Sequence, residues 1–159
     1  MIVRLIVVGA PRSSLAPGIR EYEARAARYW KLMVDEVAAG SGRGGRPSSD
    51  QVREKEGERI LARLDRTATT IALTRGGKGM TSTGLARYLE RCSLASIPEV
   101  AFVVGGAYGL GDEVIARAKI TLSLSTMTLP HELARLVLGE QLYRAGTIRR
   151  GEPYHKGNG

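Results

Sequence analysis

The chain has 159 residues and a net charge of +8, with 24 lysine and arginine residues against 16 aspartate and glutamate residues. This length can bury a substantial core, so we expect one domain over residues 1–159. No apolar run approaches the roughly 20 residues of a membrane helix, and we expect no membrane association. The single cysteine, Cys92, cannot form an internal disulfide, which favours a cytoplasmic location. The positive surplus favours a polyanionic partner such as nucleic acid.

Apolar, β-branched runs alternate with charged, helix-like segments along the whole chain. The runs predict strands at Ile2–Val8, Leu32–Val37, Thr70–Leu73, Val100–Val104 and Ile120–Leu124. The charged segments predict helices at Ile19–Trp30, from Ser48 to about Leu64, from Thr81 or Ser82 to about Cys92, at Asp112–Ala118, and from after Pro130 to about Ala145. This repeated order of strand, loop and helix predicts an α/β fold with a mainly parallel sheet flanked by helices.

Three glycine-containing segments interrupt this pattern. Residues 38–47, AAGSGRGGRP, carry Arg43 and Arg46 and form either a flexible linker or a loop that orders against RNA. RGGKG at Arg75–Gly79 follows a predicted strand and is expected to be a loop. Gly57 lies inside a predicted helix, where it costs roughly 1 kcal/mol relative to alanine, and either close packing or a site explains it.

The stretch from Glu99 to His131 holds two predicted strands that each end in a loop of small and hydroxyl residues, Gly105–Gly111 and Ser125–Pro130. Ligands of open α/β sheets lie beyond the carboxyl ends of the strands. Glycine lets a backbone approach a ligand closely, because no Cβ stands in the way. The two loops therefore predict one ligand pocket that is built mostly from backbone.

Several common sites are excluded by their spacing. The glycines of GGAYGLG at 105–111 do not follow the dinucleotide pattern G-x-G-x-x-G, and the P-loop glycine is missing before Gly77 and Lys78. No G-x-S-x-G nucleophile motif occurs. His131, His155 and Cys92 lie too far apart for metal-ligand spacing, so we expect no metal.

Four segments closely resemble the ribosomal large-subunit methyltransferase H family: VVGGAYGLG at 103–111, LSLSTMTLPHELAR at 122–135, EQLYRAGTI at 140–148 and RGEPYHK at 150–156. KEGERIL at 55–61 and the segment Leu73–Lys78 match as well, so the resemblance spans essentially the whole chain. The family often has a bulkier residue where Gly146 stands, and Gly157–Gly159 extend past its usual end.

The resemblance implies a SPOUT-class enzyme that methylates N3 of a pseudouridine in 23S rRNA. Such proteins are α/β folds with a C-terminal trefoil knot, in which S-adenosylmethionine binds in a bent conformation. They are homodimers, in which the cofactor of one protomer faces residues of the other. Carried over by position, the residues expected to contact the cofactor are Leu73, Gly105, Leu124, Ser125, Thr126, Met127, Thr128 and Leu129.

Methyl transfer to N3 of a uracil-type ring requires that a weakly acidic proton leaves, so a base or a positive charge beside the forming anion would help. The candidates in the last helix and the tail are His155, Tyr154, Arg144 and Glu140. We expect His155 or Tyr154 to accept the proton or position the base, and Arg144 to hold phosphate or the anionic ring. His131 is expected to cap or pack at the start of the last helix.

Three functions remain open at this point. The first is an RNA methyltransferase that acts on assembled ribosomes. The second is a non-catalytic RNA-binding assembly factor that retains the fold, and the third is a nucleotide-dependent α/β enzyme with a small substrate. The loop at 124–130 together with Tyr154 and His155 favours the first over the second, and the basic charge favours it over the third.

Overall fold

Five parallel strands form a single sheet in the computed structural model, which describes residues 1–40 and 45–156. The strands are β1 (Ile2–Val8), β2 (Lys31–Val37), β3 (Thr69–Gly79), β4 (Glu99–Val104) and β5 (Ile120–Ser123), and their order across the sheet is β2-β1-β4-β3-β5. The helices are α1 (Ala16–Ala26), α2 (Ser49–Leu61), α3 (Ser82–Leu94), α4 (Asp112–Arg117) and α5 (His131–Arg149). The predicted α/β fold is confirmed.

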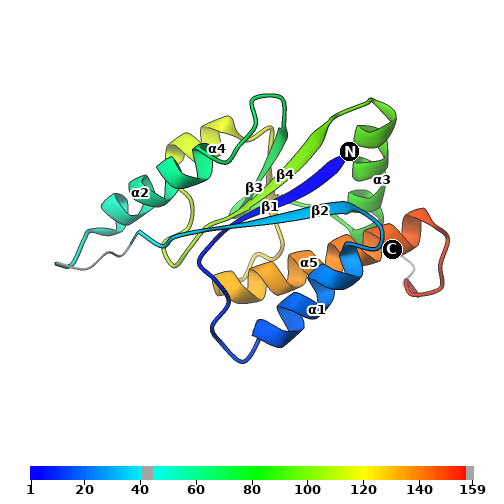
Figure 1. The fold of residues 1–159 in the computed structure, drawn as a ribbon, viewed down its shortest axis with the longest axis horizontal. Coiled ribbons are helices and arrows are strands. Elements are labelled where there is room, and N and C mark those ends of the chain that lie inside the picture. The colour runs from blue at the N-terminus through cyan, green and yellow to red at the C-terminus, as the bar shows by residue number, and fades with distance from the viewer. Residues whose placement is uncertain (41–44, 157–159) are drawn as a thin grey trace.

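The helices cover the two faces of the sheet unequally. Helices α1, α3 and α5 pack on one face, and α2 lies beside α4 on the other (Figure 1). Because side chains alternate along a strand, Val3 and Leu5 of β1 face the larger core, whereas Ile6 and Val8 face the smaller one. Continuous apolar strands are what a parallel sheet covered on both faces requires.

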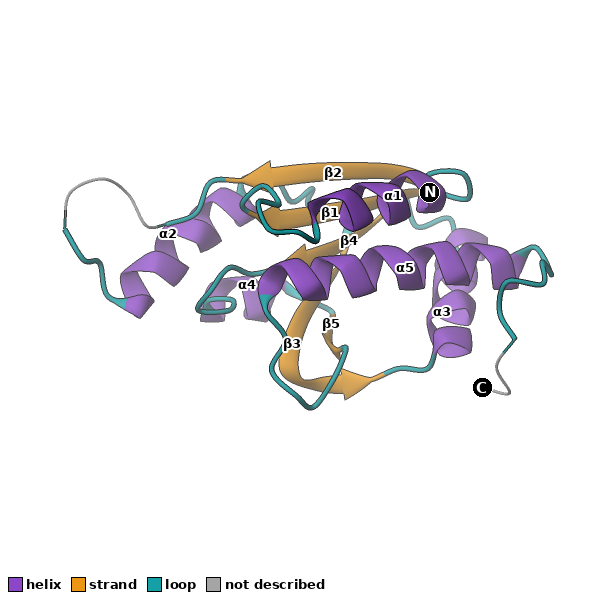
Figure 2. Cartoon of the chain, turned by 90° about the horizontal axis from the view of Figure 1, so that it is seen from below, coloured by secondary structure: helices purple, strands orange, loops and turns teal. Residues whose placement is uncertain are grey.

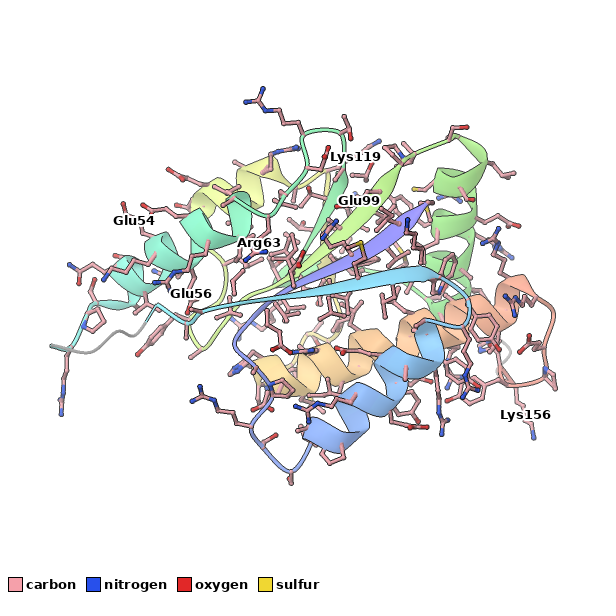
Figure 3. All side chains as sticks on the ribbon, viewed as in Figure 1. Glu54, Glu56, Arg63, Glu99, Lys119 and Lys156 are labelled. Atoms are coloured by element: carbon pink, nitrogen blue, oxygen red, sulfur yellow. The ribbon has the colours of Figure 1, made fainter. Side chains whose placement is uncertain are left out.

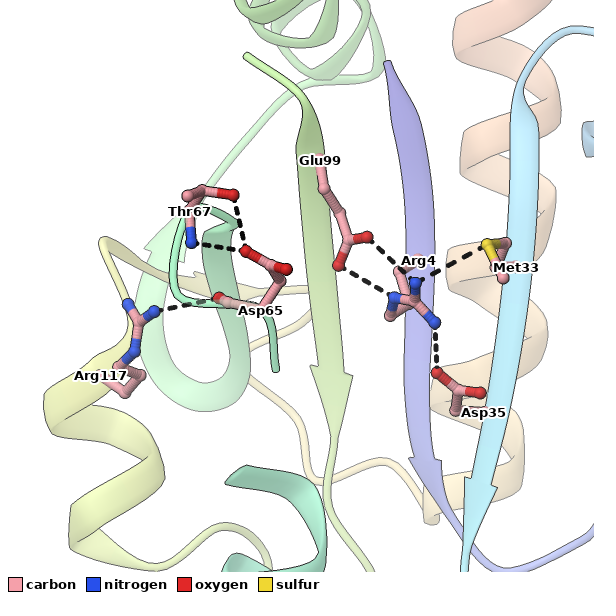
Figure 4. A network of polar contacts seen from close by, with 7 residues as sticks. All are labelled: Arg4, Met33, Asp35, Asp65, Thr67, Glu99 and Arg117. Atoms are coloured by element: carbon pink, nitrogen blue, oxygen red, sulfur yellow. Dashed lines mark hydrogen bonds and ion pairs between the residues drawn. The ribbon is translucent and has the colours of Figure 1, made fainter. Parts of the chain in front are cut away.

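An ion-pair cluster joins three strands at the amino-terminal end of the sheet. The Arg4 guanidinium on β1 donates to Asp35 on β2 at 2.6 Å and to Glu99 on β4 at 2.9 Å (Figure 4). Glu99 is 5% exposed, so an unpaired charge there would be costly. The hydrogen bonds that Arg4 donates to Glu99 are the first cause of a raised pKa for Arg4. These contacts link the register of the edge strand β2 to that of β1 and β4.

The segment Arg75–Gly79 is not a loop, contrary to our prediction, because β3 continues through it to Gly79. Leu73 and Lys78 both pair with Leu122 of β5, so the residues between them bulge out of the ladder before the pairing resumes. A Cβ on Gly77 would lie 2.7 Å from the carbonyl of Thr121, which explains the glycine. The segment has no apolar alternation, and its pairing depends on a strand more than 40 residues away.

The helix boundaries differ from the predictions by up to one turn. Helix α1 begins at Ala16 and ends at Ala26 rather than at Trp30, and α2 ends at Leu61. Helix α5 continues to Arg149, past the predicted end at Ala145. The predicted capping box is confirmed: the backbone N–H of Gln51 donates to Ser48 Oγ at 3.2 Å, and that of Ser48 donates to Gln51 Oε1 at 2.9 Å.

Three expectations from the sequence can be compared with the fold only in part. Of the two arginines predicted on the 38–47 loop, Arg46 is exposed and Arg43 lies outside the described residues. The trefoil knot is a matter of chain threading, which strand order and pairing do not define, and it stays a prediction. In the described ranges, no helix is long and apolar enough to cross a membrane.

Candidate active site

The main pocket lies at the carboxyl ends of β3, β4 and β5, where the sequence predicted a ligand site. It has a volume of about 300 Å³. Its lining includes seven of the eight residues predicted to contact a cofactor: Leu73, Gly105, Leu124, Ser125, Met127, Thr128 and Leu129. The eighth, Thr126, is exposed and is not part of the lining. The two predicted strand ends are not neighbours in the sheet, because β3 lies between them.

The lining of the main pocket is mostly apolar, with a few polar groups at its mouth. Leu73, Leu122 and Leu124 offer flat aliphatic surface on the side of the sheet. Across the mouth, Nη1 of Arg75 donates a hydrogen bond to Oγ1 of Thr128 at 3.0 Å. An apolar slot with a few placed polar groups is the usual form of a small-molecule site.

The loop after β5 holds its own shape through hydroxyl groups. Ser123 Oγ donates to the carbonyl of Ser125 at 2.8 Å, and the backbone N–H of Met127 donates to Ser125 Oγ at 3.0 Å. The Met127 side chain is 77% exposed at the edge of the pocket. The loop therefore presents its remaining backbone groups in a fixed arrangement, which suits a ligand that is recognised by backbone.

Gly105 has a different structural reason from the one we expected. A Cβ there would lie 2.7 Å from the carbonyl carbon of Gly109, so the glycine lets the loop after β4 fold back on itself. Gly109 has a φ of +75°, and Gly106 and Gly109 form a short bridge that closes the turn. Gly105 still lines the main pocket.

The tail cluster contains all four predicted catalytic residues, in contact with one another. Oε1 of Glu140 accepts hydrogen bonds from Arg144 Nη2 at 2.6 Å and from the Tyr154 hydroxyl at 3.1 Å. Nη1 of Arg144 lies 3.4 Å from Nδ1 of His155, and its guanidinium lies over the Tyr154 ring, 4.8 Å from the ring centre. The Tyr143 ring packs beside that of Tyr154.

The protonation states in the tail cluster follow from these contacts. Loss of hydration is the largest cause that raises the pKa of Tyr154 to about 12, and hydrogen bonds to Tyr22 and Glu140 add to it. The phenol therefore stays protonated near neutral pH. Arg144 can only donate, so Nδ1 of a neutral His155 acts as the acceptor, which places the ring proton on Nε2. Nε2 is buried and has no partner among residues 1–40 and 45–156.

The main pocket and the tail cluster lie at opposite ends of α5. His131 at the start of the helix lines the pocket, while Arg144 is about 20 Å further along the axis, given a rise of about 1.5 Å per residue. Figure 2 shows α5 beginning beside the loops of the pocket and running away from them toward α3. The two groups of predicted site residues therefore cannot meet within one copy of this arrangement.

Two charged residues near the main pocket were missed by the sequence analysis. Arg75 follows a predicted strand, and Glu56 lies on the buried side of α2 between Val52 and Ile60. Residues spaced by four share one face of a helix, so a glutamate between two aliphatic residues at this spacing is the signal that could have identified it. Within the described residues, no group of three or more His, Cys, Asp or Glu side chains could hold a metal ion.

Comparison with known proteins gives a consistent result. The chain is 54% identical over 157 residues to the ribosomal RNA large subunit methyltransferase H of Gemmatimonas aurantiaca, covering 98% of this chain and 100% of the relative. It is 43% identical to the protein of the same name from Bacillus pumilus, with the same coverage. The solved tRNA (m1G37) methyltransferase of Aquifex aeolicus has a similar fold, with a TM-score of 0.53 at 13% identity over 98% of this chain and 73% of that one. A family model described as a predicted SPOUT methyltransferase matches residues 1–155. The chain belongs to the SPOUT methyltransferase family.

Proposed function

We propose that this protein is a single-domain enzyme that uses S-adenosylmethionine to methylate N3 of a pseudouridine in 23S rRNA. It acts on assembled ribosomes in the cytoplasm, as a homodimer. The names of its relatives support ribosomal RNA of the large subunit as the substrate. The charge of +8 is in keeping with a polyanionic partner of this kind.

One observation carries the proposal over a non-catalytic assembly factor. Seven residues expected to contact a cofactor come together from β3, β4 and β5 around one pocket of about 300 Å³. A protein that only bound RNA would have no need of an apolar pocket of this kind. Small-molecule sites usually begin at about this volume.

The residues that line the main pocket fit the chemistry of S-adenosylmethionine, which supplies an electrophilic methyl group when bound. Leu73, Leu124 and Leu129 would enclose the flat adenine ring, and the ordered backbone after β5 would bond its polar edge. Arg75 is the one Lys or Arg side chain among the described residues of the lining, and it would face the carboxylate of the methionine portion.

The tail cluster is better suited to stabilise an anion than to remove a proton. Tyr154 is a protonated donor, and Glu140 is already occupied by Arg144 and Tyr154. His155 has its Nδ1 against Arg144, which leaves Nε2 as the ring nitrogen without a partner among the described residues. Donors and a fixed positive charge next to N3 would lower the free energy of the anionic ring that forms when the proton leaves. In our proposal Arg144 and His155 hold this ring, and Tyr154 and Glu140 position them.

The distance along α5 is the reason for the homodimer. A ring held by the tail cluster must lie close to the methyl donor, because aligned reacting atoms supply much of the rate enhancement. Within one chain, Arg144 is about 20 Å along the helix from the pocket. A second copy can bring its tail cluster to the main pocket of the first, and a two-fold arrangement then completes two equivalent sites.

The test uses rRNA from cells that lack this protein. We expect mass mapping to show a pseudouridine without its methyl group, and treatment of the ribosomes with purified protein and S-adenosylmethionine to restore it at that position alone. The Arg144→Ala variant is the matched control, since it keeps the main pocket. If the rRNA of the deletion strain is fully methylated, or calorimetry detects no binding of S-adenosylmethionine even with ribosomes present, the proposal is wrong.

A further inference from the structure

A second cavity lies beside the main pocket and has no role in the mechanism proposed above. This side cavity has a volume of about 750 Å³ and lies at the carboxyl ends of β1 and β2, against α2. It shares Gly106, Ala107 and His131 with the main pocket. A group in the side cavity is therefore separated from the main pocket only by these residues.

Glu56 is the unusual residue of the side cavity. It is 3% exposed and lies on the inner side of α2, at the end of the molecule opposite Lys156 of the tail (Figure 3). Its Oε1 accepts a hydrogen bond from the backbone N–H of Gly40 at 3.0 Å. Its Oε2 is buried and has no hydrogen-bond partner among residues 1–40 and 45–156. A buried carboxylate oxygen without a hydrogen-bond donor is energetically unfavourable, so Oε2 is available to accept a hydrogen bond from a ligand.

The other carboxylates of the side cavity are already occupied. Glu36 is paired with Arg135 at 2.9 Å. Glu132 accepts from the backbone N–H groups of Arg12 and Ser13, and the Ser13 bond is the first cause that lowers its pKa. Among the described residues, Glu56 alone in this cavity has a buried carboxylate oxygen left for a ligand.

Glu56 also touches the wall between the two cavities. A Cβ on Gly106 would lie 2.9 Å from Oε1 and 3.0 Å from Oε2, so the carboxylate lies directly against the Gly106 backbone and a side chain there would displace it. Tyr108, at the edge of the same cavity, is 53% exposed and offers an aromatic face. An aromatic face and an acceptor for N–H groups are what proteins use to hold an unstacked RNA base.

On the basis of the proposed function, we infer that the side cavity receives the pseudouridine ring and that Oε2 of Glu56 accepts the hydrogen bond from its N1–H. Pseudouridine is attached to ribose through carbon, so its N1 carries a hydrogen. In uridine the same nitrogen is bonded to ribose and cannot donate. When the ring lies in the side cavity with N3 turned toward the main pocket, its N1–H points away from the main pocket and toward Glu56. Glu56 is then the residue that distinguishes pseudouridine from uridine.

A buried acceptor gives strong discrimination, because a substrate without the matching donor leaves it unpaired. We expect the unaltered protein to methylate ribosomes that contain pseudouridine with a kcat/KM at least about 100-fold above that for matched ribosomes with uridine at the target. The variant Glu56→Gln keeps an oxygen for Gly40 but replaces the acceptor by an amide N–H. For this variant, the ratio of kcat/KM on pseudouridine ribosomes to kcat/KM on uridine ribosomes is expected to lie within about five-fold of one, mainly because activity on pseudouridine is lost.

The experiment measures kcat/KM on both ribosomes for the unaltered protein, Glu56→Gln and the control Glu58→Gln. Glu58 lies on α2 two residues away and is exposed, so its variant changes charge equally and is expected to keep the full preference. Calorimetry with S-adenosylmethionine and thermal unfolding are measured for each protein. The inference requires that Glu56→Gln binds the cofactor as the unaltered protein does and remains folded.

The possible results separate the inference from the proposed function. If the unaltered protein methylates neither ribosome, the proposed function fails and the inference falls with it. If it methylates pseudouridine but Glu56→Gln keeps the preference, or if that variant mainly loses cofactor affinity, the inference alone is wrong. Should Glu56→Gln fail to fold, rRNA with N1-methylpseudouridine decides with the unaltered protein. We expect at least about 100-fold slower methylation of this substrate, and an unchanged rate would overturn the inference.

Discussion

The separation of the main pocket and the tail cluster along α5 predicts that two inactive variants restore each other. Thr128→Trp fills the mouth of the main pocket with an indole ring, and because Thr128 is exposed the fold should tolerate it. Arg144→Ala removes the guanidinium that pairs with Glu140 at the other end of the helix. Arg144→Ala alone is expected to lose at least about 100-fold in turnover, the usual effect of deleting a group that stabilises the transition state. Thr128→Trp alone is expected to lose activity to a similar extent because it blocks the cofactor pocket.

The expected recovery follows from subunit statistics. When both variants are co-expressed equally, half of the dimers contain one chain of each kind. If each site combines the pocket of one chain with the tail of the other, a mixed dimer has one intact site and one with both defects. Mixed dimers purified from the mixture should therefore have roughly half of the activity of the unaltered protein, and the unpurified mixture roughly a quarter. If each site were built within one chain, no intact site would form and the mixture would stay inactive.

The assay is methyl incorporation into ribosomes from the deletion strain, measured on mixed dimers that carry two different affinity tags. The control places both substitutions on one chain and pairs it with an unaltered chain. If each site is shared between two chains, this mixed dimer is inactive, because each of its sites has one defect. If each site lies within one chain, the unaltered chain keeps an intact site and the dimer is half active. Inactivity of the first mixture together with half activity of the control would refute the arrangement proposed for the dimer.

Three further predictions concern single residues. Gly57→Ala should raise the free energy of unfolding in urea by about 1 kcal/mol, since its Cβ would make an ordinary 3.5 Å contact with Val114; a loss of stability would contradict this account. Gly146→Ala should lower the same quantity by about 1–3 kcal/mol, because its Cβ would lie 2.4 Å from Cβ of Tyr29; an unchanged value would show that the turn carrying Tyr29 moves aside easily. Tyr154 has a pKa raised to about 12 in the folded protein, whereas the same tyrosine in the unfolded chain ionises near pH 10. The free energy of unfolding should therefore fall as the pH rises from about 10 to about 12. Tyr154→Phe should weaken that fall in urea titrations at high pH, and it should leave the shape of the pH–rate profile between about pH 6 and 9 unchanged.

The outcome for the site shows where sequence reasoning succeeds. The loops after β4 and β5 were identified because glycine and hydroxyl residues directly follow strongly apolar runs, and both loops line the main pocket. Glu56 was missed because α2 is charged along its length, and the spacing of Val52 and Ile60 around it is the one sequence signal of its burial. Its importance comes from burial against Gly106 and Gly40, which belong to two other segments of the chain.

The sequence by itself determined the order of strands and helices, the parallel sheet and the residues around the main pocket. The elements, the sheet and the two loops of the pocket follow from local periodicity and from the rule that parallel strands present their carboxyl ends at one edge. The individual cofactor contacts were implied by the resemblance to the methyltransferase H family. Only the tertiary structure decided that β3 lies between β4 and β5, that Arg75–Gly79 joins the sheet, and that the tail cluster lies far from the main pocket. Each of these depends on contacts between distant segments or on the length of a helix laid out in space, and no window of neighbouring residues contains that information.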